Sequence, residues 1–411
     1  MNTFSSKTRG VRPTWQCLSA AVGAALLTIA FVPATAVAQD QAADDNDVAI
    51  DEVIVTAARR EQNLQDVPIA VSAITGDDLA LRGAQNITDL AETIPSLTLE
   101  PSRATSTTLT ASIRGVGQQD PRAGFEPGVA LYLDDVYLAR PQGALLDIYD
   151  VERIEVLRGP QGTLYGRNAV GGAIKYVTRR LSDDPSLRLR GVAGSYGQMD
   201  LVATGSAPLS DTFKIGGTIA SFNRDGFGDN LTTGEENYNK DVFAYRVSGE
   251  FAPNDNVLVK FGYDHTQDDT DPVICHRIRT GVTDPDLDPV LSDIYDTTGG
   301  ASRAPSTASL NGNNEQEVEG YHVSIDWSLN SDWTLRSITA NRDDYTETVI
   351  DFDGLPTMDF DAIVIYDNEQ FSQELQLLYT GEKLNMVAGL YYLDASAVNH
   401  FDIVLFNSLT Q

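Results

Sequence analysis

The glycine-rich stretch at residues 151–174 has the residue types of a phosphate-binding loop, because five glycines lie among arginines. Glycines let backbone N–H groups close around an anion where a helix begins. The spacing argues against this chemistry, since a Walker loop requires Gly-Lys before Ser or Thr, and Gly166 precedes Arg167. A dinucleotide-binding turn must open a helix, whereas Gly171 and Gly172 lead into the strand-like run AIKYVT. The pattern therefore predicts tight turns between short strands.

Patterns for catalysis or metal binding have little support elsewhere in the chain. No G-x-S-x-G, H-E-x-x-H or C-x-x-C motif occurs, and the histidines are scattered at His265, His276, His322 and His400. Two groups of aspartates suggest a cation site, but such groups more often belong to a solvated acidic loop. These aspartates are Asp264, Asp268, Asp269 and Asp271 beside His265, and Asp284, Asp286 and Asp288 further on. We predict no enzyme, no catalytic residue, no cofactor and no metal.

The N-terminal residues indicate that the protein is exported from the cytoplasm. Three basic residues precede an apolar stretch at 18–32, and AVA at 36–38 supplies a small-x-small cleavage site. This predicts a secretory signal peptide over residues 1–38, because a transmembrane anchor needs about twenty apolar residues. Cys17 lies in the signal, so the mature chain keeps only Cys275 and forms no internal disulfide.

The mature chain is strongly acidic. Removing the signal leaves 26 Lys plus Arg against 59 Asp plus Glu, a formal charge of 26 − 59 = −33. So large an excess repels polyanions, and we therefore predict no nucleic-acid partner. The charge is compatible with a soluble periplasmic protein, with a polar barrel lumen, or with a site that attracts cations.

A strand-prone run follows an acidic segment at 39–47 that has the composition of a disordered region. In IDEVIVTAARR, Val53, Ile54 and Val55 favour a strand, and no neighbouring segment is predicted to form a hairpin with it. Such a strand can pair in trans by joining the sheet edge of another protein. The alternative is an edge strand that pairs within its own domain.

Residues 48–180 have the pattern of one compact α+β domain of roughly 130 residues. IAVSAIT, TASIRGVG, GVALYLDDVYL and VERIEVLRGP are predicted strands. Two short helical stretches are broken near Gly83 and Pro95, and Asp77 or Asp78 is expected to cap the first. Residues 145–149 are expected to form one more helical turn.

Beyond Pro185 the chain consists of long alternating strands. In YHVSIDWSL, the residues from Tyr321 to Leu329 alternate between apolar and polar, so that one face of the strand is apolar and the other is polar and suited to contact with water. A soluble sandwich has the same period. Strands of about ten residues, aromatic residues near their ends, short turns at 207–212 and 252–256, and a long loop at 266–315 favour an outer-membrane barrel instead.

The order of these segments resembles the TonB-dependent outer-membrane receptors of Gram-negative bacteria. DEVIVTA, VPIAVSAITGDDL, IRGVG, GVALYLDDVYL and DVERIEVLRGPQGTLYGRNAVGGAIKYVT carry the resemblance, which covers the mature chain from about residue 50. It implies an α+β plug inside an antiparallel β-barrel of about 22 strands. It also implies uptake of a scarce solute, often a metal chelate such as a ferric siderophore, when TonB pulls on the plug. The implied partners are the TonB periplasmic domain, outer-membrane lipid and an extracellular ligand.

The resemblance also implies site residues. The TonB-binding segment, or Ton box, would be Asp51, Glu52, Val53, Ile54, Val55, Thr56 and Ala57, which includes the strand without a partner. The plug motif would comprise Arg114, Gly115, Glu152, Arg153, Glu155, Arg158, Gly159, Gly162, Gly166, Arg167, Gly171 and Gly172. Its glycines would supply turn dihedrals and close backbone approach. Its charges would pair with the barrel wall or with each other, and Arg158 is expected to tether the plug to the wall.

The expected domains are a signal peptide at 1–38, a flexible segment with the Ton box at 39–60, the plug at 61–180 and a partial barrel at 181–411. About nine strands fit between Leu187 and His400. An unpaired edge in lipid costs several kcal/mol per backbone group, so we expect a fragment or truncated product that does not transport alone. Siderophore, cobalamin, carbohydrate and plant-derived aromatic ligands stay open. The alternative function is a secreted β-rich binding or adhesion protein.

Overall fold

The structure is a computed structural model that describes residues 53–102, 108–144, 149–231, 234, 236–271, 296, 314–352, 354 and 360–405. The predicted signal peptide, Asp51, Glu52, Cys275, His276, the aspartates at 284–288 and most of the helical turn expected at 145–149 lie outside these residues. Among the described helices, none is both long enough and apolar enough to cross a membrane.

A five-stranded mixed sheet forms the centre of the N-terminal α+β region, where the sequence predicts strands. Its order is β3-β9-β10-β7-β8, and β10 pairs with β7 in parallel and with β9 antiparallel. The strands are β3 (Val71–Thr75), β7 (Val129–Leu133), β8 (Val136–Leu138), β9 (Val151–Arg158) and β10 (Gly172–Thr178). Apolar side chains pack on both of its faces, so β7 and the first five residues of β10 are buried and alternate little.

Short elements surround this sheet. They are β1 (Ile54–Val55), β2 (Gln62–Asn63), η2 (Leu64–Asp66), α2 (Gly76–Leu81), η3 (Ile87–Glu92), β4 (Leu97–Pro101), β5 (Leu109–Ile113), β6 (Val116–Gly117) and α3 (Gly162–Tyr165). The cap of α2 differs from the prediction, because Thr75 is the N-cap and its side chain accepts a hydrogen bond from the Asp78 amide. Asp77 and Asp78 instead lie in the first turn, where their charge favours the positive end of the helix dipole.

The strand at the predicted Ton box has a partner within the chain, so the expectation of no hairpin was wrong. β1 pairs antiparallel with β2, with Ile54 opposite Asn63 and Val55 opposite Gln62. The turn between them is closed by Arg59, whose amide donates to the Thr56 carbonyl at 2.9 Å and whose φ is 61°. Gln and Asn have low strand propensity, and for this reason the sequence did not indicate β2.

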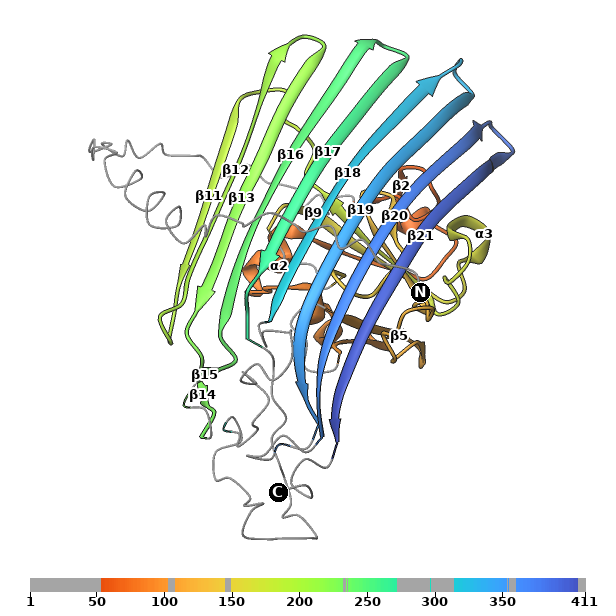
Figure 1. The fold of residues 1–411 in the computed structure, drawn as a ribbon. Helices are drawn as coiled ribbons and strands as arrows, with labels where there is room; N and C mark the ends of the chain where they lie inside the picture. The colour runs from red at the N-terminus through yellow and green to blue at the C-terminus, as the bar shows by residue number, and fades with distance from the viewer. Residues whose placement is uncertain are drawn as a thin grey trace, which may run out of the picture. The chain divides into compact units, whose positions relative to one another are not determined.

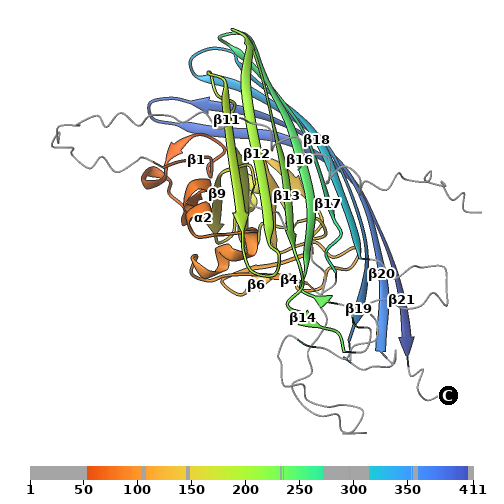
Figure 2. The same ribbon diagram turned by 90° about the vertical axis from the view of Figure 1, so that its left-hand side faces the viewer.

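Nine antiparallel strands form a second sheet in the order β11-β12-β13-β16-β17-β18-β19-β20-β21, and they lie side by side in Figure 1. They are β11 (Ser186–Ala193), β12 (Met199–Ser210), β13 (Phe213–Arg224), β16 (Lys240–Asn254), β17 (Val257–Asp268), β18 (Glu315–Ser328), β19 (Trp333–Asp351), β20 (Phe360–Thr380) and β21 (Asn385–Leu405). A small hairpin, β14 (Gly228–Asp229) with β15 (Glu236–Asn237), interrupts the connection from β13 to β16. Figure 2 shows that the nine strands form a curved sheet.

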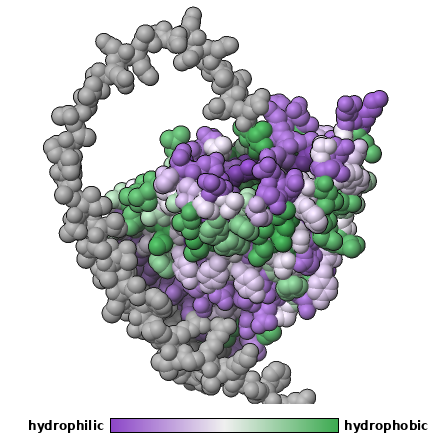
Figure 3. Space-filling view, turned by 90° about the horizontal axis from the view of Figure 1, so that it is seen from above, coloured by the Kyte–Doolittle hydropathy of each residue, from purple (hydrophilic) through white to green (hydrophobic). Residues whose placement is uncertain are grey.

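The connections confirm the predicted asymmetry between the two ends of this sheet. At one end the strands are joined by 211–212, 255–256, 329–332 and 381–384, which are all short. At the other end one connection, 194–198, is short, and the others are the longer 225–239, 269–314 and 352–359. Seen from the end with the short turns, hydrophobic surface lies in patches separated by hydrophilic ones (Figure 3).

The two faces of the sheet differ as the alternation predicts. On β18, Tyr321, Val323, Ile325 and Trp327 are exposed, whereas their neighbours on the other face are half-buried. On β20, Phe371 and Leu375 are exposed, whereas Ser372 and Gln376 are buried against the rest of the chain. An apolar outer face with a polar inner face is the pattern of a sheet that meets lipid outside and a filled lumen inside. We call the nine-stranded sheet the wall.

Candidate functional site

We call the five-stranded sheet and the short elements around it the small domain. The N-terminal segment at residues 53–60 packs into it. Val55 and Ala57 are fully buried and join the apolar cluster that contains Leu157, Tyr132 and Tyr165. Burying a valine side chain contributes about 1.5–3 kcal/mol, so the packing holds this segment without fixing it permanently. Ile54 stays exposed because strand geometry turns it to the opposite side.

Thr56 connects this segment to the two central strands of the small domain. Its amide donates to Oε1 of Glu155 at 2.8 Å, and its hydroxyl donates to the same oxygen at 3.2 Å. Nζ of Lys175 donates to the Thr56 hydroxyl at 2.5 Å. Glu155 and Lys175 lie opposite each other on β9 and β10, so the sheet register places both side chains beside Thr56. A force on Thr56 therefore acts directly on β9 and β10.

The charges beneath Thr56 are buried and paired. Glu155 and Lys175 are almost inaccessible, and they are compensated by Arg153, whose Nε donates to Glu155 at 2.8 Å, and by Asp135, 2.9 Å from Nζ of Lys175. Burial alone raises the pKa of Asp135, but Lys175 and Arg59 outweigh it and hold this pKa well below its usual range. Because the lowered pKa keeps Asp135 charged, its contribution to stability is complete at neutral pH and is lost only in strong acid.

Arg59 connects the N-terminal segment with both the small domain and the wall. Its side chain is 3% exposed, and its Nη atoms lie 3.6 Å from Asp135 and 3.8 Å from Glu374 on β20. Its Nε donates to the Leu164 carbonyl at 3.0 Å. The guanidinium also lies over the ring of Tyr165, 4.3 Å from the centroid, and this cation–π contact strengthens when it is desolvated.

Replacing Arg59 with Gln is expected to loosen this segment. The loss of the cation–π contact and of the charge facing Glu374 removes about 2 kcal/mol, so hydrogen exchange at the Thr56 amide rises about 30-fold. Arg60→Gln is the matched control, because Arg60 has no ion pair in the described part of the chain. Exchange that rises equally in both variants contradicts the role given to Arg59.

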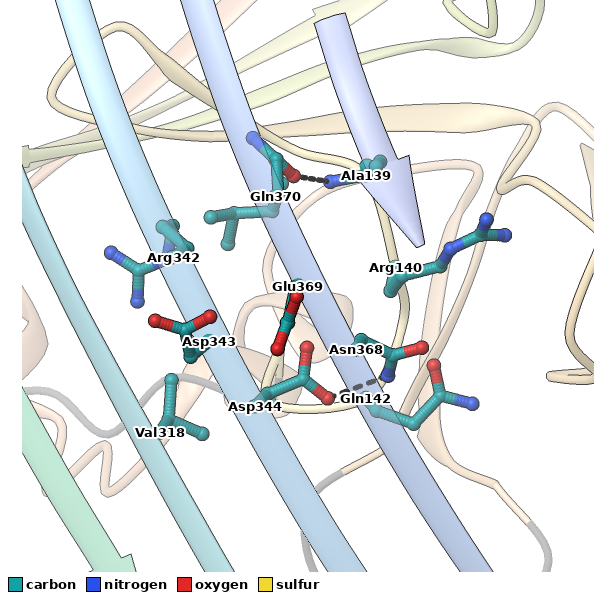
Figure 4. A pocket seen from close by; sticks show the side chains of 13 residues that line it. Ala139, Arg140, Gln142, Val318, Arg342, Asp343, Asp344, Asn368, Glu369 and Gln370 are labelled. Atoms are coloured by element: carbon teal, nitrogen blue, oxygen red, sulfur yellow. Dashed lines mark hydrogen bonds between the residues drawn. The ribbon is translucent and has the colours of Figure 1, made fainter. Parts of the chain in front are cut away.

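A second polar contact joins the small domain to the wall at the edge of its sheet. The Gln370 side chain on β20 accepts from the Ala139 amide at 2.9 Å (Figure 4). It also donates to the Tyr137 carbonyl at 2.6 Å. β8 is the edge strand, so this amide side chain satisfies backbone groups that otherwise lack a strand partner. A small pocket adjoins the contact, lined by Arg140 and Gln142 from the small domain and by wall residues that include Asp344 and Asn368.

The glycines of the predicted plug motif have different structural requirements. A Cβ on Gly171 would lie 2.6 Å from the Val116 carbonyl oxygen, and one on Gly172 would lie 2.2 Å from that of Leu157. Gly115, Gly159 and Gly166 have positive φ, and Gly166 is the C-cap residue of α3. Gly162 has neither feature, because nothing lies within 4 Å of the position that a Cβ would occupy there, and it begins α3.

The motif's charged residues mostly pair within the small domain. Arg153 contacts Glu152 and Glu155, and Arg167 pairs with Glu126 at 2.7 Å. Arg114 lies in the turn between β5 and β6 with φ 54°. Within the described ranges, Arg158 shows no ion pair to the wall, and its buried Nε has no hydrogen-bond partner. Arg59, which the local sequence does not single out, makes an ion pair with the wall through Glu374.

The chain is similar to known proteins in both sequence and fold. A family model described as the TonB-dependent receptor plug domain matches residues 63–173. The chain is 32% identical over 162 residues to an iron-regulated outer membrane virulence protein of Vibrio cholerae, covering 36% of this chain and 22% of that protein. It is 31% identical over 220 residues to a hemin receptor of Yersinia enterocolitica, covering 51% of this chain and 29% of the receptor.

The fold is similar to that of solved outer-membrane receptors. The ferric yersiniabactin uptake receptor FyuA from Yersinia pestis aligns with a TM-score of 0.67 at 21% identity, over 82% of this chain and 50% of that chain. The chain thus spans about half the length of this solved structure, and it matches less than a third of the curated relatives named above.

Proposed function

We propose that this chain, which carries the plug domain and has the fold of the TonB-dependent outer-membrane receptors, takes part in TonB-driven uptake of a scarce solute. Its relatives are receptors of the Gram-negative outer membrane, and the chain belongs to that membrane. In this proposal residues 61–180 are the plug, residues 181–411 are part of the barrel wall, and residues 51–57 are the Ton box. Asp51 and Glu52 of this segment lie outside the described residues.

The docking of Thr56 on the plug is the observation that supports this function. A strand of TonB would add to the Ton box, with main-chain hydrogen bonds supplying the affinity. Val55 and Ala57 are buried, so the segment must first leave the plug. Because Thr56 is bonded to Glu155 and Lys175, a pull on the undocking segment acts on β9 and β10. The same movement separates Arg59 from Glu374 and so removes one of the contacts with the wall.

The wall contributes to this function as part of a closed barrel. β11 and β21 are the edges of the described sheet, and each has a neighbour on one side only. Unpaired backbone groups cost several kcal/mol each in hydrocarbon, so we propose that further strands of the receptor pair with both edges. The apolar outer face of β18 and β20 favours this membrane function over the secreted binding protein considered above.

An iron chelate such as a ferric siderophore is the first solute class to test. The names of the relatives give hemin and ferric yersiniabactin as ligands of those proteins, and this is the support for the choice. The experiment follows radiolabelled iron, supplied as chelates, into cells that express the full receptor with or without TonB. We expect uptake only when TonB is present, with equal binding at the cell surface. Uptake that is the same without TonB, or recovery of the protein without detergent, contradicts the proposal.

A further inference from the structure

A second cluster of buried charges joins the plug to the wall. Arg246 on β16 is 5% exposed, and its Nη1 lies 3.9 Å from Asp134 and 3.8 Å from Asp150, which both belong to the plug. This Nη1 atom has no hydrogen-bond partner. Asp264 on the neighbouring β17 is held by both Nη atoms of Arg342, at 3.1 and 3.0 Å. Three carboxylates therefore face two guanidinium groups, since the nearby Arg179 of the plug pairs with Asp77 at 2.7 Å.

The three carboxylates are not equally compensated. Asp264 has its bidentate pair with Arg342. Asp134 accepts from the Thr178 amide and hydroxyl, both at 2.8 Å. Asp150 has the shared Arg246 at 3.8 Å and the Thr218 hydroxyl, and its side chain is only 9% exposed. Geometry and charge count thus make Asp150 the carboxylate with excess negative charge.

The other titratable and charged groups around Asp150 come from both sides of the contact. The plug contributes Asp134, Tyr149, Tyr176 and Arg179, and the wall contributes Arg246, Asp264, His322 and Arg342. Lys and Arg stay charged in the range of interest, and the tyrosines stay neutral. Within the cluster, only an aspartate or His322 can change its charge between pH 5 and 7.5.

We propose that Asp150 binds a proton when the plug is seated against the wall, so that acidification tightens the seating of the plug. The proton neutralises the excess anion of the cluster and leaves Arg246 to pair with Asp134. This property depends on neither the solute nor TonB, and it goes beyond the uptake function proposed above.

The direction of the effect follows from linkage. Burial first, and Asp134 in addition, raise the pKa of Asp150 from 3.8 to about 6 against the opposing effect of Arg246. In an unseated plug Asp150 is hydrated, and its pKa returns to the ordinary range. The seated state therefore binds the proton more tightly, and its stability falls as pH rises through about 6. The seating equilibrium is expected to be about tenfold more favourable at pH 5 than at pH 7.5.

The test is the urea-induced release of the plug from the full receptor in detergent micelles. A fluorescent label at Leu81→Cys, an exposed position on α2, reports the transition in a Cys275→Ser background. We expect the wild type to be about tenfold more stably seated at pH 5 than at pH 7.5. Asp150→Asn is expected to abolish this difference and to match the pH 5 wild type at both pH values.

Three further variants make the outcome specific. Asp66→Asn, at an exposed plug carboxylate, and His322→Gln are expected to keep the wild-type pH dependence. Asp134→Asn removes a neighbouring anion and is expected to move the pH midpoint downwards, which tests the cluster without changing Asp150. The proposal is overturned if Asp150→Asn keeps the wild-type pH dependence, if seating weakens on acidification, or if His322→Gln alone removes the effect.

Discussion

Replacing Val55 with proline is expected to reduce TonB-driven uptake by the full receptor at least about 100-fold, while solute binding at the cell surface stays near wild type. Proline has no N–H and therefore cannot complete the ladder that a partner strand forms with the Ton box, a loss of about 3 kcal/mol. Uptake of labelled solute and binding at low temperature measure the two effects separately.

Val55 has two proposed roles, which are backbone pairing with a TonB strand and packing of its side chain in the plug. A second variant separates them. Its side chain is buried in the plug, so proline also disturbs docking. Val55→Thr keeps the shape and strand propensity but buries a hydroxyl, so it should weaken docking without preventing strand addition. We expect this variant to bind the TonB periplasmic domain more tightly than wild type and to retain uptake. A peptide of residues 49–61 with proline at 55 should not bind TonB. Wild-type uptake by Val55→Pro would exclude strand addition at this position.

The wall could be predicted from the sequence because its environment acts on alternate residues. Lipid on one side and a filled lumen on the other impose period-2 alternation, which predicted the exposed face of β18 and about nine strands. The short and long connections followed from turn residues in the same way. These features are local, so each strand could be predicted from its own residues alone.

The contacts of the candidate site could not be predicted because they are non-local. Arg59 and Glu374 are separated by more than three hundred residues, and neither has an unusual local sequence. Lys175 lies in a run that predicted a strand, but the pattern gave no sign that its amine would bond Thr56. Gln62 and Asn63 pair with β1 although their propensity is low, because docking of Val55 and Ala57 holds the hairpin. The role proposed for Arg158 stays a prediction, since its local sequence does not identify a wall partner.

The substitution Gly172→Ala is expected to be the most destructive single change in the plug. Gly172 has φ 153° and lies between two neighbours, paired with Arg158 on β9 and with Val129 on β7. A Cβ would meet the Leu157 carbonyl oxygen at 2.2 Å and the Ile113 side chain at 2.7 Å, and the central strand cannot move away from either. Backbone strain and overpacking together cost roughly 4 kcal/mol or more.

This loss is a large part of a domain's stability of about 5–15 kcal/mol, so the plug should unfold or unseat while the barrel persists. Gly162→Ala is the matched control, because the space around its Cβ is empty and alanine favours the helix that begins there. We expect Gly172→Ala cells to admit large antibiotics that wild-type cells exclude, and its plug to unfold at lower urea, whereas Gly162→Ala should be neutral or slightly more stable. Equal leakage and equal unfolding midpoints in the two variants would show that close approach at Gly172 does not hold the plug together.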